Sequence, residues 1–415
     1  MIDAEVEVGD ARHPNYPAPE HSFALKLDDD LAVRLSERHH AESIYRLVER
    51  DRSHLTRWVP WTAEATKESV RQLVAEELER FGSGDGWRGE LCYEGRPIGL
   101  LWLHDWGGAG GSTEVGYLIA KDHEGKGLVT RALKGLMRHF FEDRGVGRVA
   151  IGLDARNDRS LAVVRRLGFR PEAVLRRLII VDGEPTDLSM FGLLREEYEA
   201  RHGRSEPHRR PPRFALAVDP AEDLYLAIYE PDDAPELYRL VNVNRDRLLP
   251  WMPWARDTAP EAELRFVTQR AMPGLVSGSG LEVGIWSGGR LVGSAGLHDV
   301  YARSRSAAIG YWIDENHQGR GIVTRVVRAL VERCFTEPLL GGEPFERLEV
   351  TADVNNLPSR AVPERLGFQF EGVLRRNNVG GYTPDTAVYS LLRSEWEGSR
   401  RPTEDVPTAA VLVSP

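Results

Sequence analysis

Cysteines and long apolar runs are scarce in this sequence, and each scarcity excludes a class of protein. The 415 residues include two cysteines, Cys92 and Cys334, which form no CxxC pair. They cannot supply the framework of a small disulfide-stabilised secreted domain, so we interpret them as buried thiols in a reducing cytosol. No apolar run approaches the roughly 20 residues that a membrane-spanning helix needs.

An excess of positive charge is also missing. The formal net charge is −10, which disfavours a general surface for nucleic acid or anionic membranes. The first residues, MIDAEVEVGD, lack the basic-then-apolar pattern of a signal peptide. The neighbouring His39 and His40 would diverge by about 100° on a helix and so do not form a metal pair. We therefore expect a cytoplasmic protein with no nucleic-acid partner, no membrane partner and no metal.

One unit of sequence occurs twice. HEGKGLVTR at 123–131 returns as HQGRGIVTR at 317–325, with six of nine positions identical. Further echoes keep nearly the same offset; they are WVPW and WMPW (58–61, 251–254), LHD (103–105, 297–299), NxxS (157–160, 356–359) and RLGF (166–169, 365–368). So long a period indicates tandem domains and not a solenoid. We expect domains at 22–200 and 214–400, joined by an exposed linker at 201–213 that holds three prolines and five arginines.

Hydrophobic periodicity predicts a mixed α/β domain in each half. In the first half we expect helices over 38–51, 67–81, the stretch after the glycine turn, and 158–167. The expected strands are 31–35, 88–93, 96–104, 113–120, 148–154 and a final hairpin that turns at 182–183. Each domain should therefore hold a mostly antiparallel twisted sheet, one strand–turn–helix–strand crossover and flanking helices.

The repeated glycine turn predicts a phosphate site. A strand ends at Ile119, the chain turns through Gly125 and Gly127, and a helix follows at once. Free N–H groups and the positive end of a helix dipole would meet there, and glycine lets an anion come close. A Walker P-loop (GxxxxGK[ST]) is absent, and Thr130 occupies the third glycine position of a dinucleotide fingerprint. A connection that binds nothing remains the alternative.

These motifs resemble the GNAT acyltransferases, and most nearly the RimJ/RimL-type N-acetyltransferases, over nearly all of both halves. The resemblance rests on GKGLVT and GRGIVT, the strands GYLI and GYWI, NxxS before RLGF, and WxPW. It implies acetyl-CoA, or another acyl-CoA, as the cofactor. The residues implied to bind it are Tyr117, Leu118, Ile119, Gly125, Lys126, Gly127, Leu128, Val129, Thr130 and Asn157, and Tyr311, Trp312, Ile313, Gly319, Arg320, Gly321, Ile322, Val323, Thr324 and Asn356.

The sequence departs from the wider family at two points. The turn begins at Asp122 or Asn316 where many members have Gln or Arg, and Val164 or Pro363 replaces a tyrosine general acid. Pro363 should also distort its helix, since it removes one backbone hydrogen bond at a cost of about 3 kcal/mol.

The resemblance implies attack by an amine on a thioester, and several residues could move protons in that reaction. The candidate bases are Glu114, on the strand beside the expected acyl site, and His104 and His298, whose ordinary imidazole pKa of about 6.5 suits the task. Ala308 replaces Glu114 in the second half. Ser160 and Ser359 could protonate the leaving thiolate. Alternatively, the histidines only end strands and the serines only begin helices.

The acceptor is expected to be a primary amine. An α-amino group, with a pKa of about 7.7–8.0, is easier to deprotonate than a lysine at about 10.4, which favours a peptide or protein N-terminus. A small amine, such as an antibiotic or biosynthetic intermediate, is the alternative, and one half could instead be a non-catalytic acyl-CoA-binding module. Trp58, Trp61, Trp251 and Trp254 could wall the acceptor site or simply pack in the core. The halves could pair as an internal pseudo-dimer.

Overall fold

The computed structural model describes residues 23–104, 111–181, 184–203, 214–377 and 385–400. The chain divides into two compact units, Met1–Ser36 with His40–Ala217, and Glu37–His39 with Val218–Pro415. We call these the N-terminal and C-terminal units and describe each by itself. Residues 204–213 of the expected linker and the expected turn at 182–183 lie outside the described residues. Helix α5 extends to His202, two residues into the expected linker.

The N-terminal unit holds one sheet in the strand order β1-β2-β3-β4-β5-β6-β8-β7. Its strands are β1 (Ala24–Lys26), β2 (Leu31–Leu35), β3 (Gly86–Tyr93), β4 (Arg96–His104), β5 (Ser112–Ile119), β6 (Arg148–Asp154), β7 (Arg170–Val181) and β8 (Glu184–Leu194). Its helices are α1 (Ala41–Leu55), α2 (Lys67–Ser83), α3 (Leu128–Arg138), α4 (Asp158–Leu167) and α5 (Arg195–His202). The β5–β6 pair is parallel, whereas the other strand pairs in this sheet are antiparallel.

The C-terminal unit repeats this plan in the order β10-β11-β12-β13-β14-β16-β15. Its strands are β10 (Leu224–Ile228), β11 (Leu281–Ser287), β12 (Arg290–Tyr301), β13 (Ser306–Ile313), β14 (Arg347–Asp353), β15 (Gln369–Leu374) and β16 (Thr386–Leu392), while β9 (Ala215–Asp219) spans the division between the units. Its helices are α6 (Ala234–Val243), α7 (Arg245–Leu248), α8 (Pro260–Phe266), α9 (Met272–Ser277), α10 (Ile322–Thr336), α11 (Leu357–Arg365) and α12 (Arg393–Arg400). The predicted mixed α/β class, with a mostly antiparallel sheet and one crossover in each unit, is confirmed.

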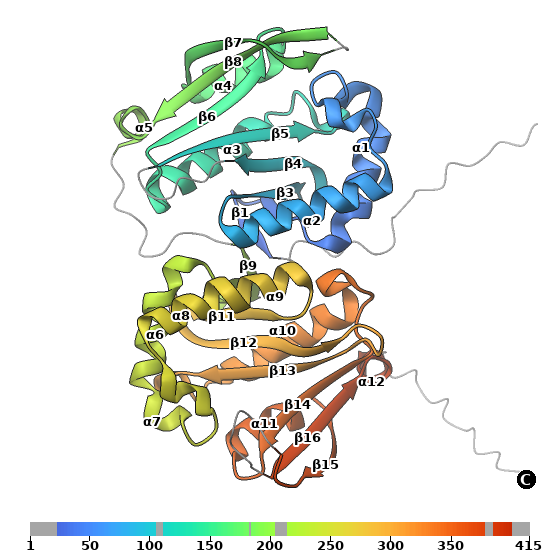
Figure 1. The fold of residues 1–415 in the computed structure, drawn as a ribbon, viewed down its shortest axis with the longest axis vertical. Helices are drawn as coiled ribbons and strands as arrows, with labels where there is room; N and C mark the ends of the chain where they lie inside the picture. Colours follow the sequence, from blue (N-terminus) through green and yellow to red (C-terminus); the bar gives the residue numbers. More distant parts are fainter. Residues whose placement is uncertain (1–22, 105–110, 182–183, 204–213, 378–384, 401–415) are drawn as a thin grey trace, which may run out of the picture. The chain divides into compact units, whose positions relative to one another are not determined.

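Helices cover both faces of each sheet (Figure 1). In the N-terminal unit α1 and α2 lie on one face of β3–β5 and α3 lies on the other. The cluster under α1 and α2 is apolar and fully buried, and it includes Ile44, Val48, Val70, Val74, Leu100 and Leu118. Burying each such side chain stabilises the unit by about 1.5–3 kcal/mol.

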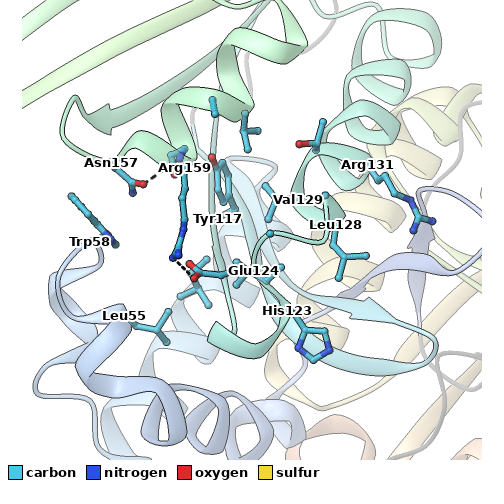
Figure 2. A pocket seen from close by; sticks show the side chains of 18 of the residues that line it. Leu55, Trp58, Tyr117, His123, Glu124, Leu128, Val129, Arg131, Asn157 and Arg159 are labelled. Atoms are coloured by element: carbon cyan, nitrogen blue, oxygen red, sulfur yellow. Dashed lines mark hydrogen bonds and ion pairs between the residues drawn. The ribbon is translucent and has the colours of Figure 1, made fainter.

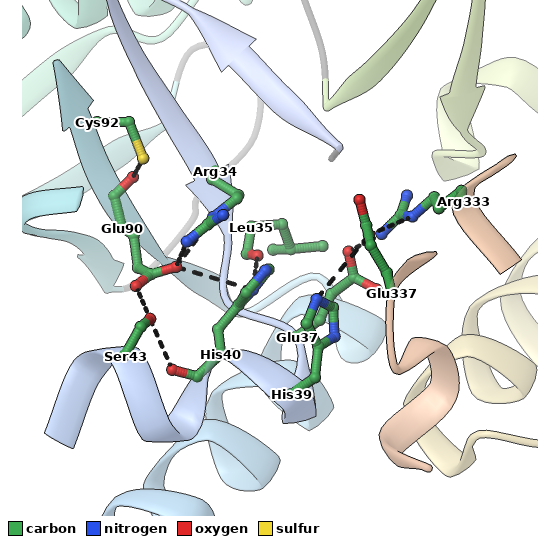
Figure 3. A network of polar contacts seen from close by, with 10 residues as sticks. All are labelled: Arg34, Leu35, Glu37, His39, His40, Ser43, Glu90, Cys92, Arg333 and Glu337. Atoms are coloured by element: carbon green, nitrogen blue, oxygen red, sulfur yellow. Dashed lines mark hydrogen bonds and ion pairs between the residues drawn. The ribbon is translucent and has the colours of Figure 1, made fainter. Parts of the chain in front are cut away.

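A buried polar network runs through the N-terminal core (Figure 3). Arg34 Nε donates to Glu90 Oε2 at 3.0 Å, and both side chains are almost inaccessible to solvent. Ser43 donates to the same carboxylate, and His40 Nδ1 lies 3.0 Å from the carbonyl oxygen of Leu35. The C-terminal unit has Gly284 at the position of Glu90. The duplicated units therefore share a backbone plan but not the polar part of their cores.

Candidate functional site

The central sheet of each unit opens between its two parallel strands. Strand β5 pairs with β6 through Ser112–Glu114 alone, although β5 continues to Ile119. In the C-terminal unit β13 pairs with β14 through Ser306–Ala308 and continues to Ile313. Beyond these points, the N–H and C=O groups on one side of each strand bond to no neighbouring strand in the described ranges. An extended molecule could pair with them as an added strand.

The glycine turn lies at the end of this opening. Gly125 and Gly127 have φ of 71° and 76°, in the left-handed region that favours glycine. Gly127 is the N-cap of α3 and provides no side-chain cap, so the first-turn N–H groups of the helix are left to bind an anion. A Cβ added at either glycine would meet no atom within 4 Å, so the turn is an open cradle. Gly319 and Gly321 repeat this geometry before α10.

A cavity follows the opening and the turn in each unit. Its volume is about 510 Å³ in the N-terminal unit and about 800 Å³ in the C-terminal unit. It is lined by nearly all the residues expected to bind the cofactor: Tyr117, Leu118, Ile119, Gly125, Gly127, Leu128, Val129, Thr130 and Asn157, and Tyr311, Trp312, Ile313, Gly319, Gly321, Ile322, Val323, Thr324 and Asn356. Lys126 and Arg320 are exposed and do not line it. An open cradle that continues into an unpaired strand edge fits the pyrophosphate and extended arm of acetyl-CoA.

Two arginines belong to this site, although in the sequence analysis they were only the first residues of the repeated RLGF motif. Arg166 Nη1 donates to Thr130 Oγ1 at 3.1 Å, and Arg365 Nη1 donates to Thr324 Oγ1 at 3.2 Å. Each threonine therefore keeps its O–H as a donor toward the cradle. The occurrence of this arginine in both halves was the sequence signal that could have identified it as a site residue.

An acidic residue closes part of the N-terminal cavity (Figure 2). Glu124 accepts from Arg159 of α4 and lies 2.9 Å from His54 Nε2 at the end of α1. These three side chains line the cavity. In the C-terminal unit Gln318 and Pro358 replace Glu124 and Arg159, so this link across the groove does not recur. Sequence reasoning missed the link because it joins three separate elements.

Asn157 and Ser160 begin helix α4 beside the cavity. Asn157 Oδ1 accepts from Ser160 N at 3.1 Å, which leaves the amide NH₂ of Asn157 to donate to a ligand. Asn356 caps α11 through Ser359 N at 3.3 Å in the same way. Tyr117 faces this helix start, and its buried hydroxyl has no hydrogen-bond partner among the described residues. Burial raises the pKa of Tyr117, and the Ser160 hydroxyl, which lies beside the phenol without meeting hydrogen-bond geometry, partly offsets that rise.

Pro363 changes this arrangement in the C-terminal unit. Helix α11 runs from Leu357 to Arg365 and keeps its Asn356 cap, so the expected distortion does not abolish the helix start. A proline at 363 has no N–H to donate to the carbonyl oxygen of Ser359. Tyr311 donates its hydroxyl to that oxygen instead, at 2.9 Å. Burial also raises the pKa of Tyr311 to about 12. The same tyrosine is thus bonded in one unit and unbonded in the other.

The candidate bases lie at the far end of the same strands. His104 and Glu114 are direct neighbours across β4 and β5, and Ala308 stands opposite His298. Arg80 Nη1 lies 3.0 Å from His104 Nδ1; arginine only donates, so His104 carries its proton on Nε2. His298 Nδ1 lies 2.8 Å from Asp299 Oδ2, which leaves Nε2 able to accept a proton. Asp105, the counterpart of Asp299, lies outside the described residues.

The four tryptophans separate into two groups. Trp58 and Trp251 line the cavities of their units. Trp61 instead packs against the apolar cluster under α1. Trp254 is 48% exposed, and its ring centre lies 6.2 Å from that of Trp312. Trp61 therefore fits the core alternative, whereas the acceptor-site role of the other three tryptophans stays a prediction.

Two further searches concern the described part of the chain only. No helix there is long and apolar enough to span a membrane. No group of three or more His, Cys, Asp or Glu side chains within those ranges could hold a metal ion.

Known proteins match this chain in both halves. The model of the acetyltransferase (GNAT) domain matches residues 30–170 and again 223–369. A putative ribosomal N-acetyltransferase of Bacillus subtilis, YdaF, is 36% identical over 184 residues, which are 43% of this chain and 96% of that protein. The ribosomal-protein-serine acetyltransferase of Escherichia coli is 28% identical over 156 residues, 38% of this chain and 84% of that protein. Among solved structures, Mycobacterium smegmatis RimJ in complex with CoA-disulfide is 23% identical with a TM-score of 0.38, over 43% of this chain and 91% of that one.

Proposed function

This chain belongs to the GNAT acetyltransferase family, and from that premise we propose that it acetylates the α-amino group of a peptide or protein N-terminus. It is an acyl-CoA-dependent N-acetyltransferase whose cofactor is acetyl-CoA. The observation that carries the choice of acceptor is the match over 96% of a putative ribosomal N-acetyltransferase. The low pKa of an α-amino group supports the same choice, because a moderate base suffices to deprotonate it.

Acetyl-CoA supplies the acetyl group as a thioester. We propose that the N–H groups at Gly125–Thr130 and Gly319–Thr324 bind its pyrophosphate, with Arg166 and Arg365 supporting the two threonines. Tyr117–Ile119 and Tyr311–Ile313 would pair with its extended arm through their free backbone edge. The Asn157 and Asn356 amides would donate to the same arm. These contacts hold one reactant in place before the amine arrives.

We propose different proton acceptors in the two units. In the N-terminal unit Glu114 takes the proton of the amine, and His104, whose Nδ1 is bonded to Arg80, acts as a hydrogen-bond donor. In the C-terminal unit His298 Nε2 takes the proton, with Asp299 fixing the tautomer. Direct transfer and transfer through one water both fit these roles.

We propose that the sulfur is protonated from the start of the helix after β6 or β14. Ser160 and Ser359 line the cavities at that point. In the N-terminal unit Tyr117 is a further donor, since its hydroxyl is buried beside Ser160 without a partner among the described residues. It would replace the tyrosine that the wider family carries at the position of Val164. Tyr311 is committed to the Ser359 carbonyl and would contribute less.

The acceptor can be tested with the full chain and acetyl-CoA. The panel holds peptides with a free N-terminal serine, the same peptides blocked at the N-terminus but carrying an internal lysine, an aminoglycoside and a polyamine. Mass spectrometry locates the acetyl group, and a Gly127→Trp/Gly321→Trp double variant is the control. We expect acetylation at the α-amino group. Acetylation of the small amines alone would replace this proposal with the small-amine alternative.

A further inference from the structure

One row of side chains differs sharply between the two units. On the sheet face covered by α1 and α2, Arg88, Trp102 and Gly116 are neighbours across β3, β4 and β5. The corresponding row in the C-terminal unit is Glu282, Gly296 and Gly310 across β11, β12 and β13. The row lies two residues along the strand, and so on the same face, from His104 or His298.

In the N-terminal unit the Trp102 ring fills this row, and the charge of Arg88 is paired with Glu77. Arg88 is buried, and its Nη2 donates to Glu77 Oε1 at 3.1 Å. Its guanidinium lies 4.9 Å from the Trp102 ring centre and 5.7 Å from that of Trp61. A Cβ on Gly116 would come within 2.1 Å of the Trp102 indole, so that ring occupies the space over Gly116. No room is left here for a second charged group of the acceptor.

In the C-terminal unit Gly296 stands in the place of Trp102, and the row holds one carboxylate, that of Glu282. Glu282 Oε2 lies over Gly296, 2.6 Å from where a Cβ on that glycine would stand. Ala271 precedes the capping Gly278 by seven residues, as Glu77 precedes Gly84, so the ion-pair partner is replaced as well as the arginine. No hydrogen bond or ion pair joins Glu282 to another residue in the described ranges, and Arg270, whose charge acts on Glu282, is exposed.

An unpaired, partly buried carboxylate favours a cation. Burial raises the pKa of Glu282 to about 7, and the charge of Arg270 only partly offsets the rise. A cationic ligand would stabilise the ionised form through a charge-assisted hydrogen bond. His298 Nε2 lies over Gly310, 3.2 Å from the position of a Cβ there, and Gly310 is the cross-strand partner of Gly296. Glu282 and the proposed base therefore lie over adjacent positions of one face.

We propose that Glu282 is a cation-binding subsite that makes the C-terminal unit prefer amine acceptors carrying a second positive charge close to the reacting amine. The inference rests on the transfer reaction proposed above and names the acceptor class of one unit. The N-terminal unit lacks the subsite because Arg88 and Trp102 occupy its place. The two units would then serve different acceptors with the same cofactor.

The test isolates the C-terminal unit in the full chain. A Gly127→Trp variant blocks the N-terminal cradle, and turnover is measured with two peptides that differ only at residue two, Ser-Lys and Ser-norleucine. Turnover is also compared between 1,4-diaminobutane and butylamine, to measure whether a free diamine is preferred over a monoamine in the same way. Glu282→Gln is the test variant, and Glu263→Gln, a buried carboxylate bonded to Thr258 in the same unit, is the matched control. Thermal melting checks that each variant folds.

We expect kcat/KM to favour the lysine peptide about tenfold, and the preference to vanish in Glu282→Gln through a rise in KM but persist in Glu263→Gln. A preference that survives Glu282→Gln, or that is absent from the start, overturns the subsite. If no amine is acetylated by either unit, the proposed function fails separately. Calorimetric binding of the lysine peptide to the Gly127→Trp chain, with and without Glu282→Gln, then still decides the subsite.

Discussion

A single residue, Pro363, alters the hydrogen bonding of a tyrosine on another element. Because proline cannot donate to the Ser359 carbonyl, Tyr311 does so. Val164 holds the same position in α4 and can make the ordinary helical bond, which leaves the Tyr117 hydroxyl unbonded among the described residues. One substitution thus decides whether a buried hydroxyl is available to a ligand.

The first prediction concerns these two hydroxyls. Tyr117→Phe in a Gly321→Trp background should lower the kcat of the N-terminal unit about 10–100-fold, because a proton donor is lost. Tyr311→Phe in a Gly127→Trp background should change the kcat of the C-terminal unit by less than about threefold. Stopped assays of CoA release measure both, and calorimetry checks that acetyl-CoA affinity is unchanged.

Pro363→Val is the matched control for this pair of variants. It restores the helical donor and frees Tyr311, so C-terminal turnover should rise. An equal loss in the two phenylalanine variants, or no response to Pro363→Val, would show that the tyrosines have only packing roles.

The second prediction concerns pH and Glu282. Its pKa in the folded chain is about 7, above the ordinary 4.5, so folding favours the protonated form. The free energy of unfolding should therefore fall by about 1–3 kcal/mol as pH rises from about 4.5 to 7, and then level off. Glu282→Gln should lack this slope when thermal unfolding of the two proteins is compared across the range. Identical pH profiles would place Glu282 in a solvated, unperturbed setting.

At the scale of elements, the turn and helix α4 are linked in one unit only. Glu124 places a negative charge at a cradle proposed for phosphate, and the guanidinium of Arg159 neutralises it, while His54 Nε2 lies 2.9 Å from the same carboxylate. The link therefore competes with the ligand for Arg159. In the C-terminal unit Gln318 and Pro358 stand at these positions, so its cradle has neither the competing carboxylate nor the arginine.

The third prediction follows from that difference. Glu124→Gln should raise the acetyl-CoA affinity of the N-terminal cradle about tenfold, since the repulsion is removed and Arg159 is released. The reciprocal Gln318→Glu, with no arginine to neutralise it, should lower the affinity of the C-terminal cradle. Isothermal titration in the Gly321→Trp and Gly127→Trp backgrounds separates the two sites. Unchanged affinity in both variants would remove the turn from the phosphate contacts.

The sequence predicted the helices, strands and turns better than the side-chain contacts that join them. Apolar residues at helical spacing predicted the buried faces of α1 to α3, and the paired glycines predicted a turn directly before a helix, because these signals are local. The Glu124–Arg159 link and the Tyr311–Ser359 bond join distant segments, which no local pattern records. The row from Arg88 to Gly116 required strand register, which is set by tertiary packing.

At the scale of the molecule, duplication produced two units with the same cradle and different surroundings. The fourth prediction is that acetyl-CoA titrates two sites per chain, and that Gly127→Trp and Gly321→Trp each remove one. A bulky side chain at a left-handed glycine fills the open cradle and strains the turn. One site in the parent chain would instead support the alternative of a single functional unit.

Because the β5–β6 and β13–β14 pairings are short, two neighbouring strands in the middle of each sheet are hydrogen-bonded over only part of their length. Beyond the last pair, every second residue of β5 and β13 presents main-chain N–H and C=O groups that no strand in the described part of the chain bonds. The free chain consequently carries two internal edges of the kind that invites association between molecules. A bound ligand would act as the missing length of strand. Acetyl-CoA should therefore lower the tendency of the chain to aggregate, in addition to serving as the acetyl donor.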